Sequence, residues 1–108
     1  MTDASGHVTT TAVFHDSVVK KERDEKTKIQ LAAKISQLLS QRGLTQEQAA
    51  ALLQIKQPKV SALMRSNLEG FSVERLLKFL NALDCDVDIV VRIKTSHRRS
   101  ARIQVKAA

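Results

Sequence analysis

The polar segment from Gln54 to Asn67 is the part of the sequence whose residue types best suit a defined chemistry. It holds three cations, Lys56, Lys59 and Arg65, and no aspartate or glutamate. Lysine and arginine contact phosphates, while amide and hydroxyl side chains can hydrogen-bond to the edges of bases. The whole chain carries a formal charge of +7. A basic excess on a small domain favours a polyanionic partner.

The other candidate residues do not form a catalytic or metal-binding pattern. Asp84, Asp86 and Asp88 have the spacing that begins a calcium loop, but the glycine and later glutamate of such a loop are missing. The three histidines are scattered and the single cysteine cannot complete a zinc site with them. Neither Ser61 nor Ser72 has a histidine or aspartate at a recognisable spacing for nucleophilic catalysis. We therefore expect a non-enzymatic protein without metal or cofactor.

The amino-acid composition limits the possible fold class and cellular compartment. The 108 residues are enough for one domain, and its core must be aliphatic because the chain has three Phe and neither Trp nor Tyr. One cysteine excludes an internal disulfide and fits a reducing compartment. The sequence has no apolar run long enough for a membrane span and no hydrophobic signal core. We expect a soluble cytoplasmic protein of the mainly α class.

Apolar residues that recur at three- and four-residue steps predict four helices. Their expected ranges are 26–42, 45–53, 57–65 and 73–83. An alternative is that Val18 and Val19 extend the first helix back through the charged run at 20–26. Gly43 ends the first helix, because glycine adopts the left-handed conformation of a helix C-terminus without strain. Thr45 opens the second helix and forms a capping box with Gln48, three residues later. Ser72 caps the fourth helix.

The second and third helices, within Leu44–Arg65, are too short to be stable alone and need the first and fourth helices as a platform. That arrangement leaves the polar face of the third helix exposed. A helix about 10–12 Å across fits the major groove of B-DNA. The sequence therefore predicts a helix-turn-helix that reads duplex DNA; the alternative is a helix face that is merely solvated.

Residues 26–94 resemble the XRE-like (lambda-repressor-like) helix-turn-helix proteins, and among them the small regulators related to HigA-type antitoxins. The motifs that carry this resemblance are LTQEQAA, QPKVSALMR, FSVERLLKFLNAL and DVDIVVR. The resemblance implies a lambda-repressor-like bundle of four to five helices that binds DNA.

The candidate DNA-binding residues lie on the second and third helices and just after them. They are Thr45, Gln46, Lys56, Gln57, Pro58, Lys59, Ser61, Ala62, Arg65 and Asn67. The resemblance implies that Gln46 lies at the phosphate backbone and braces Gln57, which is placed to pair with an adenine edge. It also implies that Lys59 reaches a guanine or a phosphate, and that Ala62 can meet a thymine methyl.

The resemblance further implies phosphate contacts for Arg65 and Asn67, just past the third helix. Three positions depart from the family pattern. Gln54 stands where most members have glycine, and a positive φ there would cost roughly 1 kcal/mol. Lys56 replaces the usual small cap of the third helix, and Pro58 replaces a polar residue that reads bases in many members.

Residues 86–94 alternate apolar and polar side chains with a period of two, which predicts a β-strand. A single recognition helix reads few base pairs, and helix-turn-helix dimers therefore bind two half-sites of a palindrome. We expect this strand to pair antiparallel with its copy about Val90, which sets Asp88 opposite Arg92. The candidate dimerisation residues are Val87, Asp88, Ile89, Val90, Val91, Arg92 and Ile93. The alternative is an intramolecular strand partner at 8–13.

These patterns predict one helix-turn-helix domain at 18–94 between two flexible ends. Residues 1–17 form the expected N-terminal arm, and residues 95–108 form the expected basic tail. From Arg92 to the last residue the chain has six cations and no anion. Such a tail is either a solvated end or an arm that touches phosphates.

Two functions are consistent with the sequence. The first is a homodimeric transcriptional regulator that represses its own promoter by binding a palindromic operator. The second is a protein-interaction module, an antitoxin that neutralises a RelE-like or HigB-like ribonuclease toxin. The family resemblance allows both in one molecule, with DNA and toxin on different surfaces. A neighbouring short gene for a basic toxin would favour the second.

Overall fold

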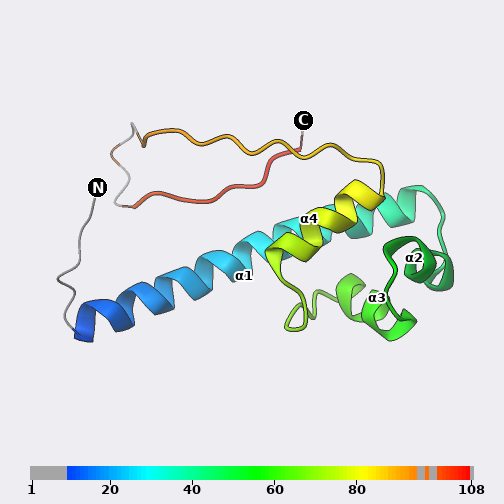
Figure 1. Ribbon diagram of the computed structural model, residues 1–108, viewed down its shortest axis with the longest axis horizontal. Helices are drawn as coiled ribbons and strands as arrows, with labels where there is room; N and C mark the ends of the chain where they lie inside the picture. The colour runs from blue at the N-terminus through cyan, green and yellow to red at the C-terminus, as the bar shows by residue number, and fades with distance from the viewer. Residues whose placement is uncertain (1–9, 95–96, 98–99, 108) are drawn as a thin grey trace.

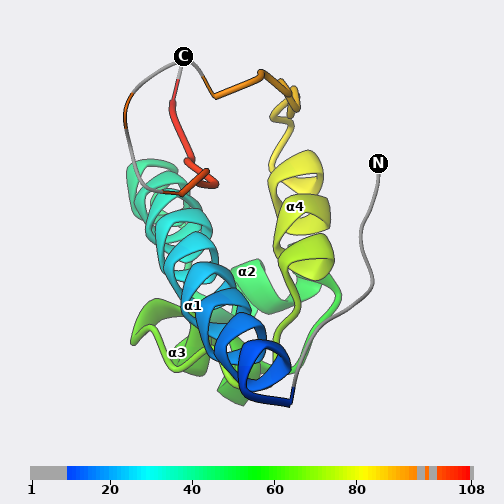
Figure 2. The ribbon, with the colours of Figure 1, turned by 90° about the vertical axis from the view of Figure 1, so that its left-hand side faces the viewer.

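The computed structural model describes residues 10–94, 97 and 100–107, with the side chains of 10–23 excepted. The described chain has four helices: α1 (Thr10–Gln41), α2 (Gln46–Leu53), α3 (Gln57–Met64) and α4 (Val73–Ala82). The long α1 forms a spine, with α4 packed beside its C-terminal half and α2 and α3 gathered at the same end (Figures 1 and 2). The predicted mainly α fold with four helices is confirmed.

A single apolar core, mainly aliphatic but with Phe71 and Phe79, joins the four helices and the loop between α3 and α4. Its buried members are Leu31, Ala32, Ile35, Leu39, Ala49, Leu53, Val60, Leu63, Leu68, Phe71, Leu76, Phe79, Leu80 and Leu83. Helices α2 and α3 have only eight residues each, and isolated helices shorter than about 12–15 residues are marginal in water. The two helices pack against each other, α2 also packs against α4 and α3 also packs against α1. Burial of their apolar side chains contributes roughly 1.5–3 kcal/mol per large side chain.

Two helices begin at hydroxyl side chains, as their sequences predict. The Thr45 hydroxyl accepts a hydrogen bond from the Gln48 backbone N–H (3.0 Å), and the Thr45 backbone N–H donates to Gln48 Oε1 (2.9 Å). This reciprocal pair confirms the capping box of α2. The Ser72 hydroxyl accepts from the Arg75 backbone N–H (3.1 Å) and confirms the cap of α4. Both caps pair donors that would otherwise lack partners at a helix N-terminus.

Every helix is followed closely by a residue in the left-handed conformation. These residues are Gly43 (φ 64°), Gln54 (φ 58°), Ser66 (φ 60°) and Asp84 (φ 65°). Gly43 confirms the predicted end of α1, and the Leu44 N–H then donates back to the Leu39 carbonyl (3.2 Å). The other three carry a Cβ, so each conformation costs roughly 1–2 kcal/mol that tertiary packing must offset.

Helix α1 starts earlier than the sequence suggested. Residues 10–17 are helical, although they belong to the expected N-terminal arm at 1–17, and the alternative strand at 8–13 overlaps the same helix. The stretch from 10 to 41 contains neither glycine nor proline, so nothing in it interrupts helical hydrogen bonding. Residues 1–9 lie outside the described residues.

The predicted β-strand at 86–94 is wrong for the single chain. The segment leaves the end of α4 and runs back along the molecule (Figure 1), without a strand assignment in its described residues. Its apolar side chains do not pack against the helices as expected: Ile89 is 77% exposed, and Val91 and Ile93 are each 89% exposed. A strand requires a second strand to complete its hydrogen-bond ladder, and the described chain provides none here.

The expected basic tail, 95–108, is described only at residues 97 and 100–107; residues 95, 96, 98, 99 and 108 lie outside the described residues. The described part has no helix or strand. Val105 is half-buried and packs against the main core, so an apolar side chain ties this part of the tail to the helical domain.

Candidate nucleic-acid interface

The turn between α2 and α3 depends on Gln54. This residue has φ 58° and ψ 45°, and its N–H donates to the Ala50 carbonyl. The Ile55 N–H donates to the same carbonyl (3.0 Å). The left-handed residue thus ends α2 and reverses the chain, so that α3 begins three residues later. The position where the family usually has glycine therefore does require a positive φ, here on a glutamine.

Helix α3 is anchored by its buried face rather than by a side-chain cap. Lys56, the residue before its first turn, is extended (φ −77°, ψ 151°) and its side chain makes no capping hydrogen bond. Pro58 lies in the first turn of α3. The N–H groups of a first turn have no partner within the helix, so the N–H that proline lacks costs no helical hydrogen bond. Val60 and Leu63 are fully buried. Tertiary packing therefore fixes where α3 lies and which of its faces is exposed.

Most of the candidate DNA-binding residues lie at the surface. The exposed ones are Thr45, Gln46, Lys56, Gln57, Pro58, Arg65 and Asn67. Lys59, Ser61 and Ala62 are half-buried, and Ala62 packs against the core. The exposed polar surface therefore comes from three places that the fold brings to one end of the molecule: the start of α2, the start of α3 and the loop after α3.

The two candidate residues that follow α3 are held by a defined backbone turn. The Ser66 N–H donates to the Leu63 carbonyl (3.1 Å), and the Asn67 N–H donates to the Ala62 carbonyl (2.9 Å). This pair of bonds around the left-handed Ser66 is the Schellman arrangement. It fixes the backbone from which Arg65 and Asn67 project. The sequence did not predict the left-handed Ser66, and only the polar Ser-Asn pair after the last apolar residue hints at a turn.

Positive charge dominates this surface. Lys56, Lys59 and Arg65 belong to a stretch without acidic residues, flanked in sequence by Glu47 on α2 and Glu69 in the loop after α3. The ion pair between Glu74 and Lys78 on α4, at 3.9 Å, involves none of these three cations. Lys56 and Arg65, whose side chains are exposed, are available to attract an anionic ligand.

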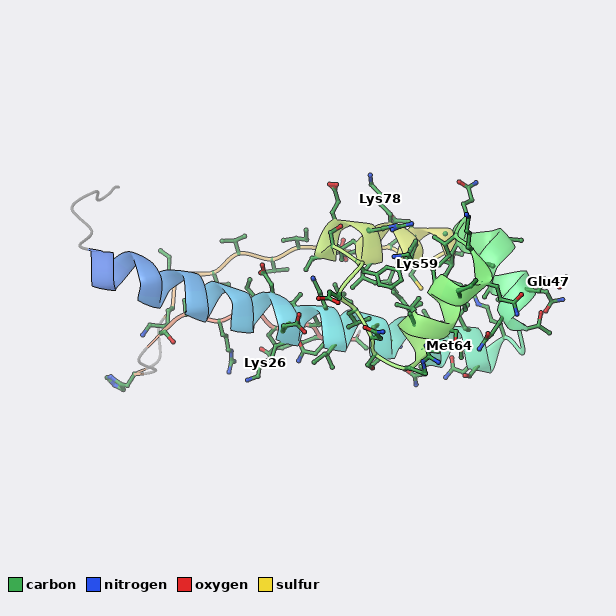
Figure 3. The ribbon with its side chains drawn as sticks, turned by 90° about the horizontal axis from the view of Figure 1, so that it is seen from below. Lys26, Glu47, Lys59, Met64 and Lys78 are labelled. Carbon is green, nitrogen blue, oxygen red and sulfur yellow. The ribbon has the colours of Figure 1, made fainter. Side chains whose placement is uncertain are left out.

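A group of cations and aromatic rings lies between α3 and α4, and the sequence reasoning missed it. Lys59 Nζ lies 5.1 Å from the centre of the Phe71 ring, and Arg75 Cζ lies 5.6 Å from the same centre. Arg75 Cζ is also 5.7 Å from the Phe79 ring, which meets Phe71 edge to face at 6.0 Å. Figure 3 shows Lys59 between the α3 and α4 ribbons. The path of the loop between α3 and α4 brings these residues together. Helical periodicity in the sequence does not predict the path of a loop.

A groove of about 380 Å³ between the end of α2 and α4 is lined by Leu52, Leu53, Gln54, Ile55, Arg75, Lys78, Phe79 and Ala82. This lining contains no histidine, cysteine, hydroxyl or carboxylate side chain. Among described residues, no three His, Cys, Asp or Glu side chains gather to hold a metal ion. None of the described helices is long and apolar enough to cross a membrane.

Comparison with known proteins places this arrangement in a family. Residues 13–92 match the family model described as a helix-turn-helix domain. A solved structure of a proposed XRE-family transcriptional regulator is 51% identical, with a TM-score of 0.78, over 82% of this chain and 99% of that chain. The proposed antitoxin HigA2 of Mycobacterium tuberculosis is 36% identical over 62 residues. That match covers 57% of this chain and 61% of the relative, which is less than two thirds of its length. The chain therefore belongs to the helix-turn-helix family, within its XRE-like group.

Proposed function

We propose that this chain is a sequence-specific DNA-binding transcriptional regulator that reads the major groove with α3 and represses its own promoter. The observation that carries the proposal is the surface of α3: an exposed, acid-free helix face set on a buried platform. The similarity to a proposed XRE-family transcriptional regulator supports the same function. The regulator would act in the cytoplasm by binding alone, without catalysis.

In this proposal the exposed residues around α3 divide into two roles. Gln57, in the first turn of α3, reads a base edge, for which an amide suits adenine. Arg65 and Asn67, on the fixed turn after α3, contact phosphates and set the register of the protein on the duplex. Gln46 at the start of α2 lies at the phosphate backbone beside Gln57.

We further propose that the regulator works as a homodimer on a palindromic operator, joined through residues 87–93. In the single chain this segment is extended and its apolar side chains are exposed. Antiparallel pairing about Val90 would cover them and set Asp88 opposite Arg92. Each opposed charge pair contributes only about 0.2–1 kcal/mol, so apolar burial holds the dimer and the charges select the register.

A gel shift on the chain's own upstream DNA tests the DNA-binding proposal. Gln57→Ala should weaken operator binding by about 1–3 kcal/mol, with much less effect on random DNA. Arg65→Ala should weaken binding to both DNAs, and should reduce the slope of log K against log salt by about 0.9 because one phosphate contact is lost.

Lys26→Ala is the matched control for the loss of a cation, because Lys26 is exposed on α1 and far from α3 (Figure 3). It should leave operator preference unchanged. If Gln57→Ala and Arg65→Ala bind both DNAs as the parent does, α3 is not the reading element.

The second candidate function is that of an antitoxin, and the similarity to HigA2 favours it. We propose that a RelE-like or HigB-like toxin binds a surface other than α3. Co-expression of this chain with the product of a neighbouring short gene, followed by co-purification and a growth assay, tests it. Rescue of growth by the chain supports the antitoxin role, and continued toxicity with no co-purification contradicts it.

A further inference from the structure

Lys59 occupies an unusual place for a candidate DNA contact. It lies in the first turn of α3, yet it is half-buried, and its ammonium lies 5.1 Å from the centre of the Phe71 ring. Phe71 is only 3% exposed and packs edge to face on Phe79 of α4. An ammonium over an aromatic face is attracted by the ring quadrupole. The Lys59 side chain thus connects α3 to the loop that leads into α4, and its ammonium lies against Gly70 and Phe71 of that loop.

Gly70 supplies the room that this ammonium needs. A Cβ built on Gly70 would lie 2.4 Å from Lys59 Nζ, and the next nearest atom is Lys59 Cε at 3.8 Å. Gly70 is not in the left-handed region, so its backbone conformation does not require glycine. What the missing side chain provides is space for the end of Lys59. An alanine at position 70 would displace the Lys59 ammonium from this place without changing the net charge of the protein.

Helix α3 needs such a connection at its N-terminus. The Thr45 and Ser72 side chains cap α2 and α4, but the Lys56 side chain makes no capping hydrogen bond to α3. The first turn of α3 also carries Gln57, two residues before Lys59. A contact that holds this turn therefore limits the positions from which Gln57 can meet a base.

We propose that Lys59 is a positioning residue, which fixes the first turn of α3 through Phe71 and Gly70 and so orients Gln57, without itself contacting a phosphate. This inference rests on the proposed function, in which α3 reads DNA. It assigns to Lys59 a different role from the phosphate or guanine contact implied by the family resemblance.

The test compares Lys59→Ala, Gly70→Ala and the double variant with the parent, by titrating operator and random DNA over a range of salt. Lys59→Ala should lower the operator-to-random affinity ratio by about twofold to fivefold, the equivalent of one partly exposed cation–π contact, with an unchanged salt slope. Gly70→Ala should lower the ratio similarly, although every charge is retained. The double variant should lose no more than either single one, and Lys59→Arg should retain most of the ratio.

Lys78→Ala is the matched control, because it removes a cation of α4 that is exposed and paired with the equally exposed Glu74, and its ratio should equal that of the parent. Far-UV circular dichroism checks that each variant folds. If Lys59→Ala does not fold, the test rests on Gly70→Ala. That variant should fold, because only the flexible end of the Lys59 side chain must move to accommodate the new Cβ.

A salt slope reduced by about 0.9 in Lys59→Ala, with Gly70→Ala binding as tightly as the parent, would show a phosphate contact and overturn the inference. So would a full operator preference in both single variants. A parent with no operator preference would overturn the proposed function together with this inference, and the two failures are thereby distinguished.

Discussion

Replacement of Gln54 by glycine should increase the stability of this domain. Gln54 is held at φ 58° and ψ 45°, where the Cβ of an L-residue crowds the following carbonyl at a cost of roughly 1–2 kcal/mol. Glycine has no such crowding. Its greater freedom in the unfolded chain offsets about 0.5–1 kcal/mol of the gain. The free energy of unfolding should therefore rise by a few tenths to about 1 kcal/mol.

The side chain of Gln54 offers little that would be lost. It is exposed and only borders the groove beside α4, whereas the hydrogen bond to Ala50 comes from the backbone and survives the change. For a domain of this size, 1 kcal/mol corresponds to about 4–8 °C in the melting temperature. DNA binding should not change, because Gln54 is not among the candidate contacts.

Urea denaturation followed by far-UV circular dichroism is the appropriate assay, because the chain has no Trp or Tyr to report by fluorescence. Gln37→Gly serves as the matched control. Gln37 is exposed on α1, four residues before the last residue of the helix, where glycine should lower stability by up to about 1 kcal/mol. The same substitution should thus act with opposite signs at the two sites. A Gln54→Gly variant no more stable than the parent would refute the reasoning from backbone strain.

Three further changes probe other features. Gly43→Ala should lower stability by a few tenths to about 1 kcal/mol in the same urea assay, because the strain of a Cβ at φ 64° exceeds the gain from a less flexible unfolded chain. Nothing lies within 4 Å of an added Cβ to compensate by packing, and an unchanged midpoint would contradict this. Ser72→Ala should cost about 1 kcal/mol through loss of the bond from the Arg75 N–H, and equal stability would argue against the cap. Asp88→Arg and Arg92→Asp should each weaken the proposed dimer in light scattering, and the double variant should restore it; a parent that stays monomeric at high concentration contradicts the pairing.

The parts of the fold that follow local rules could be predicted from the sequence. Thr45 with Gln48, and Ser72, mark helix starts because their hydroxyls pair with backbone N–H groups a few residues away. Gly43 marks a helix end for an equally local reason. Gln54 was identified as a departure from the family pattern, and the structure gives it the positive φ that the pattern requires. Each of these features depends on neighbours within one turn of helix.

The features that could not be predicted depend on distant parts of the molecule. Lys59 is a charged residue on the polar face of its helix, so the sequence predicts that it is exposed. The path of the loop through Gly70 instead places Phe71 beneath its ammonium. Residues 86–94 alternate apolar and polar side chains as a strand does. This pattern does not predict which segment would supply the second strand. Within the candidate site, the exposure expected for Gln57, Arg65 and Asn67 is observed. Ser61 and Ala62 are instead partly covered by neighbouring residues, which helical periodicity alone does not predict.

The extended segment after α4 also bears on how long the protein survives in a cell. Proteases bind their substrates in extended form, and an exposed chain without helical hydrogen bonds meets that requirement without unfolding. Residues 86–94 have exposed side chains throughout and include Arg92 and Lys94, which are cleavage sites for trypsin. A copy paired through this segment would be protected, since its backbone would lie within a hydrogen-bonded ladder. The rate at which the chain is cut here should therefore fall as protein concentration rises, so that abundance and lifetime increase together.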